Sequence, residues 1–352
     1  MKQLRSNVIR AGLEALYLTG AHHLLRPIFA GVGTIFTLHH VRPKRSGEFQ
    51  PNRHLEVTPD FLRAMLLHLR SSQIDIISMD EVHRRLTERS LSRRFACFTF
   101  DDGYRDNRDY ALAVMREFDA PLTVFVASDF AQGTGRPWWI ALEMVIAKAS
   151  PVEVEIDGVA TRLDTSTAAS KQTAFDRLHD WLRGLPERQN LEREIGALCA
   201  RHAVDEAAVC RELCMSWEEL ALFSQEPLVG IGAHSVTHCN LANESDEVVS
   251  REMTMSRARI ESALQRGVVH FAYPYGDRGA AGRREFALAK AAGFKTAVTT
   301  RPGMIFPENA GHLTALPRVS LNGNYQDERI LPVLTSGAAT AMWNGFRRID
   351  AA

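Results

Sequence analysis

Residues 95–104, FACFTFDDGY, contain the pattern that decides the fold. An apolar run of strand-forming residues ends in two adjacent carboxylates, Asp101 and Asp102, and a glycine. Successive strand residues point to opposite faces, so adjacent acids within a strand rarely share a target. Gly103 permits a turn at the strand end, which lets both carboxylates converge on one site. The alternative is a polar strand end that caps the next helix.

Similar β-rich runs recur on both sides of this stretch. We predict about eight strands, at Thr34–His39, Ile74–Ser78, Phe95–Phe100, Leu122–Ala127, Val229–Ala233, Val268–Tyr273, Thr296–Thr299 and Val319–Leu321. Cap and periodicity patterns predict helices between them, among them Asp60–Arg70, a helix from Ser216 with a capping box to Glu219, Glu244–Arg266 and Ala280–Ala292. Strands that alternate with helices indicate parallel βα units. We therefore expect an α/β fold, a distorted (β/α) barrel of seven or eight strands with a mostly helical insertion.

The alternation breaks over residues 136–228, which we predict to be an insertion. The run VEVEIDGVATRLD alternates around Asp157-Gly158, a type I′ hairpin pattern, and helical sequence follows it. The barrel would then comprise residues 34–135 and 229–325. Residues 1–33 would form an N-terminal helical segment and residues 326–352 a C-terminal tail.

Composition excludes several classes of protein. The 352 residues carry 42 Lys plus Arg and 42 Asp plus Glu, which argues against a nucleic-acid binder and against a strongly anionic substrate. No stretch approaches the length of a membrane span. The five cysteines show no framework spacing, and reduced thiols fit a cytoplasmic protein. Cys210 and Cys214 are four residues apart, which on a helix places them on one face. We interpret them as reduced thiols, and a pair of metal ligands is the alternative.

The N-terminal segment has basic residues followed by a leucine-rich stretch that Glu14, His22 and His23 interrupt. A signal peptide needs an unbroken apolar region, so we predict no cleaved signal. An amphipathic helix packed on the domain is one interpretation. The other is a peripheral membrane contact, which would make a cytoplasmic protein membrane-associated.

A second polar motif, GAHSVTHCN, follows the predicted strand at residues 229–233. His234 and His238 have the spacing of two imidazoles that bind one metal, although such a pair is often structural. Two histidines and one carboxylate form a common ligand set that leaves positions for water and substrate.

These motifs resemble a family. TFDDG (99–103) and HSVTH (234–238) are similar to the first two motifs of the polysaccharide deacetylases with a NodB-homology domain, carbohydrate esterase family four, and FAYPYG (271–276) resembles the third. The resemblance covers roughly residues 34–325, with the insertion at 136–228 outside the shared core, and implies a distorted barrel. It also implies a divalent metal, most often zinc with cobalt or nickel as alternatives, bound by Asp102, His234 and His238. Asp101 would be the general base and the Tyr275 N–H the oxyanion donor.

The sequence departs from that family pattern at two places. Ala272 stands where the family's third motif carries an arginine that orients the base, and Arg318 is a candidate substitute. No Leu-x-His motif follows to supply the general acid. Some family members resemble a circular permutation, in which this motif lies on the first strand, so we assign the acid to His39. His40 would be a supporting or structural group.

The expected reaction is hydrolysis of the acetamide of an N-acetylated sugar in an oligosaccharide, polysaccharide or glycolipid. Tyr104, Pro274, Trp138 and Trp139 are candidates for contacting the sugar, although aromatic residues mostly form core. Two alternatives stay open, a hydrolase of a non-sugar amide with the same metal site and a non-catalytic carbohydrate-binding relative. Ala272 is the best support for the second.

Overall fold

Seven parallel strands close into a barrel, and an eighth extends it. The computed structural model of the protein describes residues 2–348. The sheet order is β1-β12-β11-β10-β9-β6-β5-β4, and an additional pairing of β1 with β5 closes the ring and leaves β4 outside it. The strands are β1 (Gly33–Leu38), β4 (Asp75–Ile76), β5 (Phe95–Phe100), β6 (Leu122–Val126), β9 (Val229–Ala233), β10 (His270–Ala272), β11 (Thr296–Pro302) and β12 (Leu316–Ser320). The predicted distorted (β/α) barrel is confirmed.

Helices surround the barrel because apolar strands such as β1, β5 and β6, buried along their whole length, need cover on the outside as well. The surrounding helices are α3 (Pro59–Ser71), α4 (Met79–Thr87), α5 (Leu112–Glu117), α6 (Ser128–Ala131), α11 (Trp217–Phe223), α12 (Asp246–Leu264) and α13 (Arg283–Ala291). The predicted caps of α3 and α11, Thr58 and Ser216, accept the expected backbone hydrogen bonds. The helix predicted to extend to Arg266 ends earlier, because Gln265 adopts a left-handed conformation with φ 51°.

The last strand differs from its predicted position. We expected Val319–Leu321, with Arg318 ahead of the strand, but β12 begins at Leu316 and Arg318 lies inside it. Parallel pairing of β12 with β1, in which Val319 is the partner of Phe36, fixes this register. Neighbouring strand residues face opposite sides, and the Arg318 side chain is completely buried.

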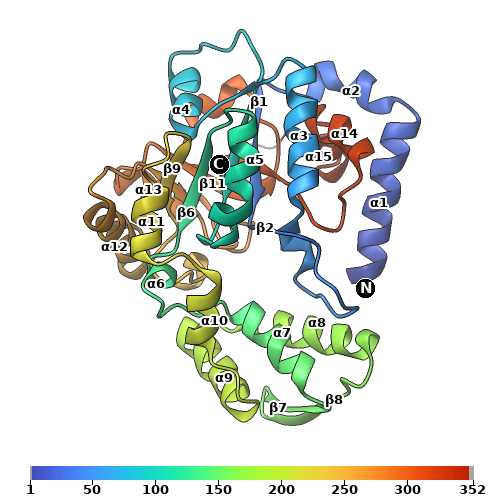
Figure 1. The fold of residues 1–352 in the computed structure, drawn as a ribbon, viewed down its shortest axis with the longest axis vertical. Helices are drawn as coiled ribbons and strands as arrows, with labels where there is room; N and C mark the ends of the chain where they lie inside the picture. Colours follow the sequence, from blue (N-terminus) through green and yellow to red (C-terminus); the bar gives the residue numbers. More distant parts are fainter. Residues whose placement is uncertain (1, 349–352) are drawn as a thin grey trace.

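The chain between α6 and α11 forms a separate lobe, seen at the bottom of Figure 1. We call residues 138–213 the lobe; its elements are α7 (Trp138–Lys148), β7 (Val152–Ile156), β8 (Val159–Leu163), α8 (Ala168–Gly184), α9 (Arg188–Arg201) and α10 (Glu206–Leu213). A hydrophobic cluster of its own holds these elements together. The predicted type I′ hairpin is confirmed, since β7 and β8 are antiparallel and Asp157 and Gly158 have φ 51° and 79°.

The two ends of the chain pack together on one side of the barrel. The N-terminal segment forms α1 (Lys2–Leu18) and α2 (Ala21–Phe29), separated at Gly20 with φ 69°. The segment expected as a tail contains α14 (Leu331–Thr335) and α15 (Ala338–Trp343), and both contact the N-terminal helices. No helix in the described part of the chain combines the length and the hydropathy that crossing a bilayer requires.

Candidate active site

Polar side chains from several strands meet at the carboxyl end of the barrel, where sites of such barrels are located. Asp101 and Asp102 follow β5, and His39 follows β1. Because Leu38 and Phe100 are register partners, His39 and Asp101 leave the sheet at the same level. His234 follows β9, which pairs with β6 and β10. The barrel therefore brings together motifs that lie more than 130 positions apart in the sequence.

Asp102, His234 and His238 place three potential metal-ligand atoms within 4.8 Å of one another. The Nε2 atoms of His234 and His238 lie 3.4 and 3.2 Å from the same oxygen, Asp102 Oδ1. This is the one such group of three or more among residues 2–348, and it contains none of the cysteines. All five cysteines are free and buried, so the Cys210–Cys214 metal pair gains no support.

The surroundings of these three residues fit a divalent cation. His234 Nδ1 donates to the Ala272 carbonyl at 2.7 Å, which leaves Nε2 with a lone pair toward Asp102. Burial alone would raise the pKa of Asp102, but His238 and His234 hold that pKa well below its usual value. Burial opposes a proton on His234, yet Asp102 and Asp101 raise its pKa. The site thus attracts positive charge between these groups, where a metal ion would replace a proton.

Unusual backbone conformations hold the ligands in position. Asp102, Ser235 and His238 have φ 74°, 63° and 59°, in the left-handed region that non-glycine residues rarely adopt. The buried carboxylate of Glu252 on α12 accepts the backbone N–H groups of Val236 and Thr237 at 2.8 and 2.9 Å. Sequence reasoning missed Glu252, because a single acid on a charged helix face gives no indication that it turns inward.

Arg318 reaches Asp101 from the strand on the other side of β1. Its two terminal nitrogens donate to the two carboxylate oxygens at 2.8 and 2.6 Å, and both side chains are almost completely buried. Burial alone would raise the pKa of Asp101, but the Arg318 guanidinium outweighs it and lowers this pKa. Ala272 belongs to the buried cluster that contains Phe125, and the Arg318 guanidinium lies 6.0 Å from the centroid of the Phe125 ring. A guanidinium thus contacts Asp101 in this chain although position 272 is an alanine.

His39 is partly buried beside the acids, and its pKa differs from the ordinary value near 6.5 that would suit proton delivery near neutral pH. Burial lowers the pKa of His39 to about 4, although Asp102 and Asp101 act in the opposite direction. The imidazole is therefore neutral near pH 7 and can donate a proton only after it receives one.

His40 is held behind the site. Its Nδ1 lies 2.7 Å from Asp106 Oδ2, and its ring stacks on Tyr104 with centroids 3.6 Å apart. Tyr104 itself is completely buried. His40 is therefore held by Asp106 and Tyr104, and a supporting or structural role for it stays a prediction.

Tyr275 connects the barrel to the lobe. Its φ is 58°, and no described residue accepts its backbone N–H, which leaves this group available for a substrate oxygen. Trp138 Nε1 donates to the Tyr275 hydroxyl at 2.8 Å, and the Arg183 guanidinium lies 5.0 Å from the centroid of its ring. Burial raises the pKa of Tyr275 to about 12, so its phenol is neutral. Sequence reasoning missed Arg183, since the contact depends on how the lobe docks.

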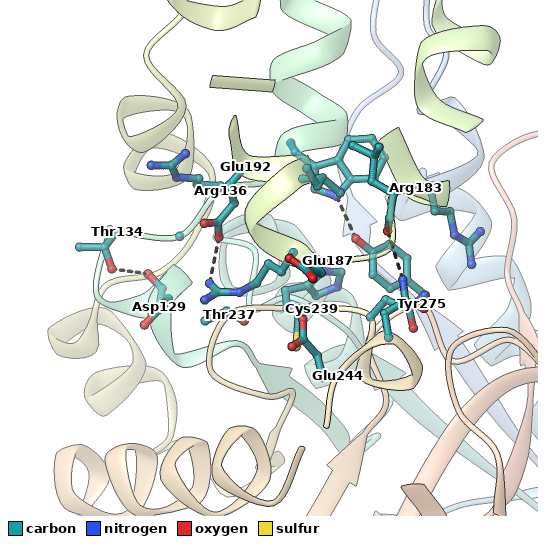
Figure 2. A pocket seen from close by; sticks show the side chains of 18 residues that line it. Asp129, Thr134, Arg136, Arg183, Glu187, Glu192, Thr237, Cys239, Glu244 and Tyr275 are labelled. Carbon is teal, nitrogen blue, oxygen red and sulfur yellow. Dashed lines mark hydrogen bonds and ion pairs between the residues drawn. The ribbon is translucent and has the colours of Figure 1, made fainter. Parts of the chain in front are cut away.

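A small cavity lies between lobe and barrel beside His238 (Figure 2). Trp138 and Tyr275 are in its wall, and its volume is about 70 Å³, well below that of most ligand pockets. Trp139 is buried behind it and packs on the His238 ring at 4.9 Å. Pro274 is also buried. Of the four candidates for sugar contact, the structure places Trp138 alone in this wall.

Comparison with known proteins supports the same kind of site. The chain matches the family model described as polysaccharide deacetylase over residues 88–176 and 189–297. The matched segments extend into the lobe and include Asp101, Asp102, His234, His238 and Tyr275. They do not reach β1 or β12, so the geometry alone supports roles for His39 and Arg318. No curated protein matches the chain.

Several solved structures share the fold. The Streptococcus pyogenes deacetylase PplD, in complex with acetate, is 18% identical with a TM-score of 0.54, over 83% of this chain and 92% of that one. IcaB from Ammonifex degensii is 16% identical with a TM-score of 0.54, over 86% and 97% of the two chains. BC0361, a polysaccharide deacetylase from Bacillus cereus, is 14% identical with a TM-score of 0.54, over 86% and 68%. Because the family model matches more than half of it, the chain belongs to the polysaccharide deacetylase family and is a hydrolase of the amide-bond type that acts on acetylated sugars.

Proposed function

We propose that the protein is a metal-dependent N-deacetylase that hydrolyses the acetamide of an N-acetylated sugar in an oligosaccharide, polysaccharide or glycolipid. The observation that carries the proposal is the convergence of Asp102, His234 and His238 beside the buried Asp101–Arg318 pair. One carboxylate and two imidazoles suit zinc, with cobalt or nickel as alternatives. A divalent cation bound there supplies Lewis-acid polarisation of the acetamide carbonyl and of the attacking water.

Each remaining role belongs to a residue of this chain. Asp101, kept ionised by Arg318, takes a proton from the attacking water as the water oxygen bonds to the acetyl carbon. The Tyr275 N–H donates to the oxyanion that forms. His39, neutral at rest, receives the proton that Asp101 took from the water and passes it to the sugar nitrogen as the C–N bond breaks. The products are acetate and the free amine.

Recognition of the sugar involves the surface where the lobe meets the barrel. Trp138 lies in the cavity wall and offers an aromatic face, while Tyr104, Pro274 and Trp139 are buried and do not line the cavity. Arg318 opposite Asp101 removes the main argument for a non-catalytic relative, which was the alanine at position 272.

Acetate release tests the proposal directly. Chelated protein is assayed on a panel of N-acetylglucosamine oligomers, with and without added zinc, cobalt or nickel. We expect release that depends on metal and is abolished by Asp101→Asn, with metal occupancy retained. Asp109→Asn, an exposed carboxylate outside the site, is the control and keeps full activity. Metal-independent release, or an active Asp101→Asn variant, contradicts the mechanism.

A peripheral membrane location is a further part of the proposal. The N-terminal helices expose large apolar side chains, at Val8, Leu18, Leu24 and Ile28. Exposed apolar residues on a basic amphipathic helix favour contact with the membrane interface. Deletion is too disruptive a test because α1 packs on the C-terminal helices. Leu24→Gln/Ile28→Gln, which changes exposed positions, is expected to abolish binding to vesicles of anionic lipid without lowering thermal stability; unchanged binding contradicts this location.

A further inference from the structure

A second and larger cavity is separate from the one beside His238, and the loop that follows His40 forms part of its wall. Its volume is about 560 Å³, within the range of small-molecule sites. Three segments form its walls: the inner face of α1, the loop at residues 42–58, and residues 323–330. None of the residues assigned to deacetylation lines it.

The cavity wall carries an excess of positive charge. Six cationic side chains line it against three acidic ones, and the six are Arg10, Arg42, Lys44, Arg45, Arg53 and Arg329. Arg42 and Arg45 share one carboxylate, Glu56, and Arg45 also pairs with Glu143, outside the wall, at 2.8 Å. Arg329 pairs with Asp327. In the described part of the chain, neither Lys44 nor Arg53 is within ion-pair distance of an acid.

One donor in this wall is also unsatisfied. The Nε atom of Arg42 is buried and finds no acceptor among the described residues. This nitrogen has almost no exposed surface, so a ligand in the cavity would meet the remainder of the Arg42 side chain, which is 20% exposed. Arg10 Nη2 donates to the Asn324 carbonyl at 3.0 Å, which joins α1 to the third wall segment.

The cavity is built by long-range contacts. Ser6 and Tyr325 join α1 to the third segment through their hydroxyls at 3.0 Å. The Gly323 N–H donates to the His54 carbonyl at 3.1 Å, and a Cβ at Gly323 would lie 2.1 Å from the Arg53 carbonyl oxygen. Glycine is therefore required where these segments touch. Walls fixed in this way reduce the cost of ordering charged side chains when a ligand binds.

We propose that this cavity binds a phosphate or phosphodiester group. Guanidinium groups match phosphate oxygens with paired donors, and a nearby ammonium adds charge. A neutral sugar would not compensate the excess cations. The loop begins three residues after His39, about 10 Å of extended chain, so this wall of the cavity starts close to the active site in the sequence. The phosphate can belong to a soluble ligand or to the headgroup of a membrane lipid, since α1 also exposes apolar residues.

The test compares two double variants with equal loss of charge. Lys44→Gln/Arg53→Gln removes two exposed cations of the cavity. Arg251→Gln/Lys290→Gln removes two exposed cations from α12 and α13, on the opposite side of the barrel from α1 in Figure 1. Thermal stability of all proteins is measured first, and we expect no change, because none of these side chains is buried.

Calorimetric titration with inorganic pyrophosphate, at physiological salt to screen non-specific attraction, then measures binding. We expect binding by the wild type and the control, and at least about tenfold weaker binding by the cavity variant. Flotation with phosphatidylglycerol vesicles distinguishes the sources: parallel loss in the cavity variant indicates a lipid headgroup, and vesicle binding that the cavity variant leaves unchanged indicates a soluble phosphate. No pyrophosphate binding by the wild type, or equal binding by both variants, overturns the proposal.

Discussion

Replacing Arg318 by methionine tests the most buried charge pair of the protein. Arg318 makes four hydrogen bonds, to the Thr99 hydroxyl, the Thr299 carbonyl and both oxygens of Asp101. Methionine keeps much of the apolar stem but leaves a carboxylate buried without a counter-charge. Removing one partner of a buried pair typically costs about 3–5 kcal/mol in the free energy of unfolding. We expect a loss of about 4 kcal/mol at neutral pH.

The loss of unfolding free energy in Arg318→Met depends on pH, because the substitution reverses the direction in which the pKa of Asp101 is shifted. In the wild type the pKa of Asp101 is held below its unfolded value, so its contribution is present above that value and lost as pH falls through the folded pKa. Without Arg318, burial raises the pKa of Asp101 above its unfolded value. The variant then loses stability as pH rises from about 4 toward neutral, and the difference from wild type grows over that window.

Urea unfolding of chelated proteins between about pH 4 and pH 7 measures this difference. Asp101→Asn/Arg318→Met removes the unpaired charge and should recover about 2 kcal/mol relative to the single variant. Acetate release by Arg318→Met at neutral pH should fall by at least about 100-fold, because a protonated Asp101 cannot act as a base. A pH-independent loss of stability, or a double variant no more stable than Arg318→Met, would refute the reasoning.

Three further predictions use other parts of the site. The depressed pKa of His39 means that the unfolded chain binds a proton at this imidazole more readily than the folded chain does. The free energy of unfolding of the chelated protein should therefore rise by about 3 kcal/mol between about pH 4 and pH 6.5. His39→Gln should flatten this rise in urea unfolding, and an unchanged slope contradicts the prediction. Trp138→Phe removes the hydrogen bond to the Tyr275 hydroxyl and should lower kcat about tenfold with little effect on KM. The control Trp217→Phe loses an exposed hydrogen bond to Gln132 and should leave kcat and KM unchanged. Equal effects of the two substitutions would show that the Trp138–Tyr275 hydrogen bond does not position Tyr275. Zinc at 100 times its Kd should stabilise the protein by about 2.7 kcal/mol in thermal unfolding. Asp102→Asn should remove most of this gain, because Asp102 is one of the three candidate ligands. An equal zinc effect on the wild type and the variant means that the metal binds elsewhere.

Local patterns in the sequence were sufficient to predict most helices and strands and many residues of the candidate site. The run Phe95–Phe100 is a strand with the predicted bounds, because its apolar residues can only be buried in a sheet. The turn at Asp157-Gly158 formed because both positions need positive φ, which glycine adopts freely and aspartate tolerates. The Asp-Asp-Gly and His-x-x-x-His motifs each follow a strand, and parallel strands bring their carboxyl ends to one rim.

What the sequence alone determined, then, is what depends on neighbours a few positions away: the strands, the caps, the hairpin and the groups available at each strand end. Closure of the barrel decided the rest, because it joins residues that no local spacing relates. It paired Arg318 with Asp101, 217 positions away, and it partly buried His39, which lowered the pKa of that imidazole. It also gathered six cations from three distant segments around one cavity, a concentration of charge that a net charge of zero conceals. Long-range electrostatics depends on distance and burial, and both exist only once the chain has folded.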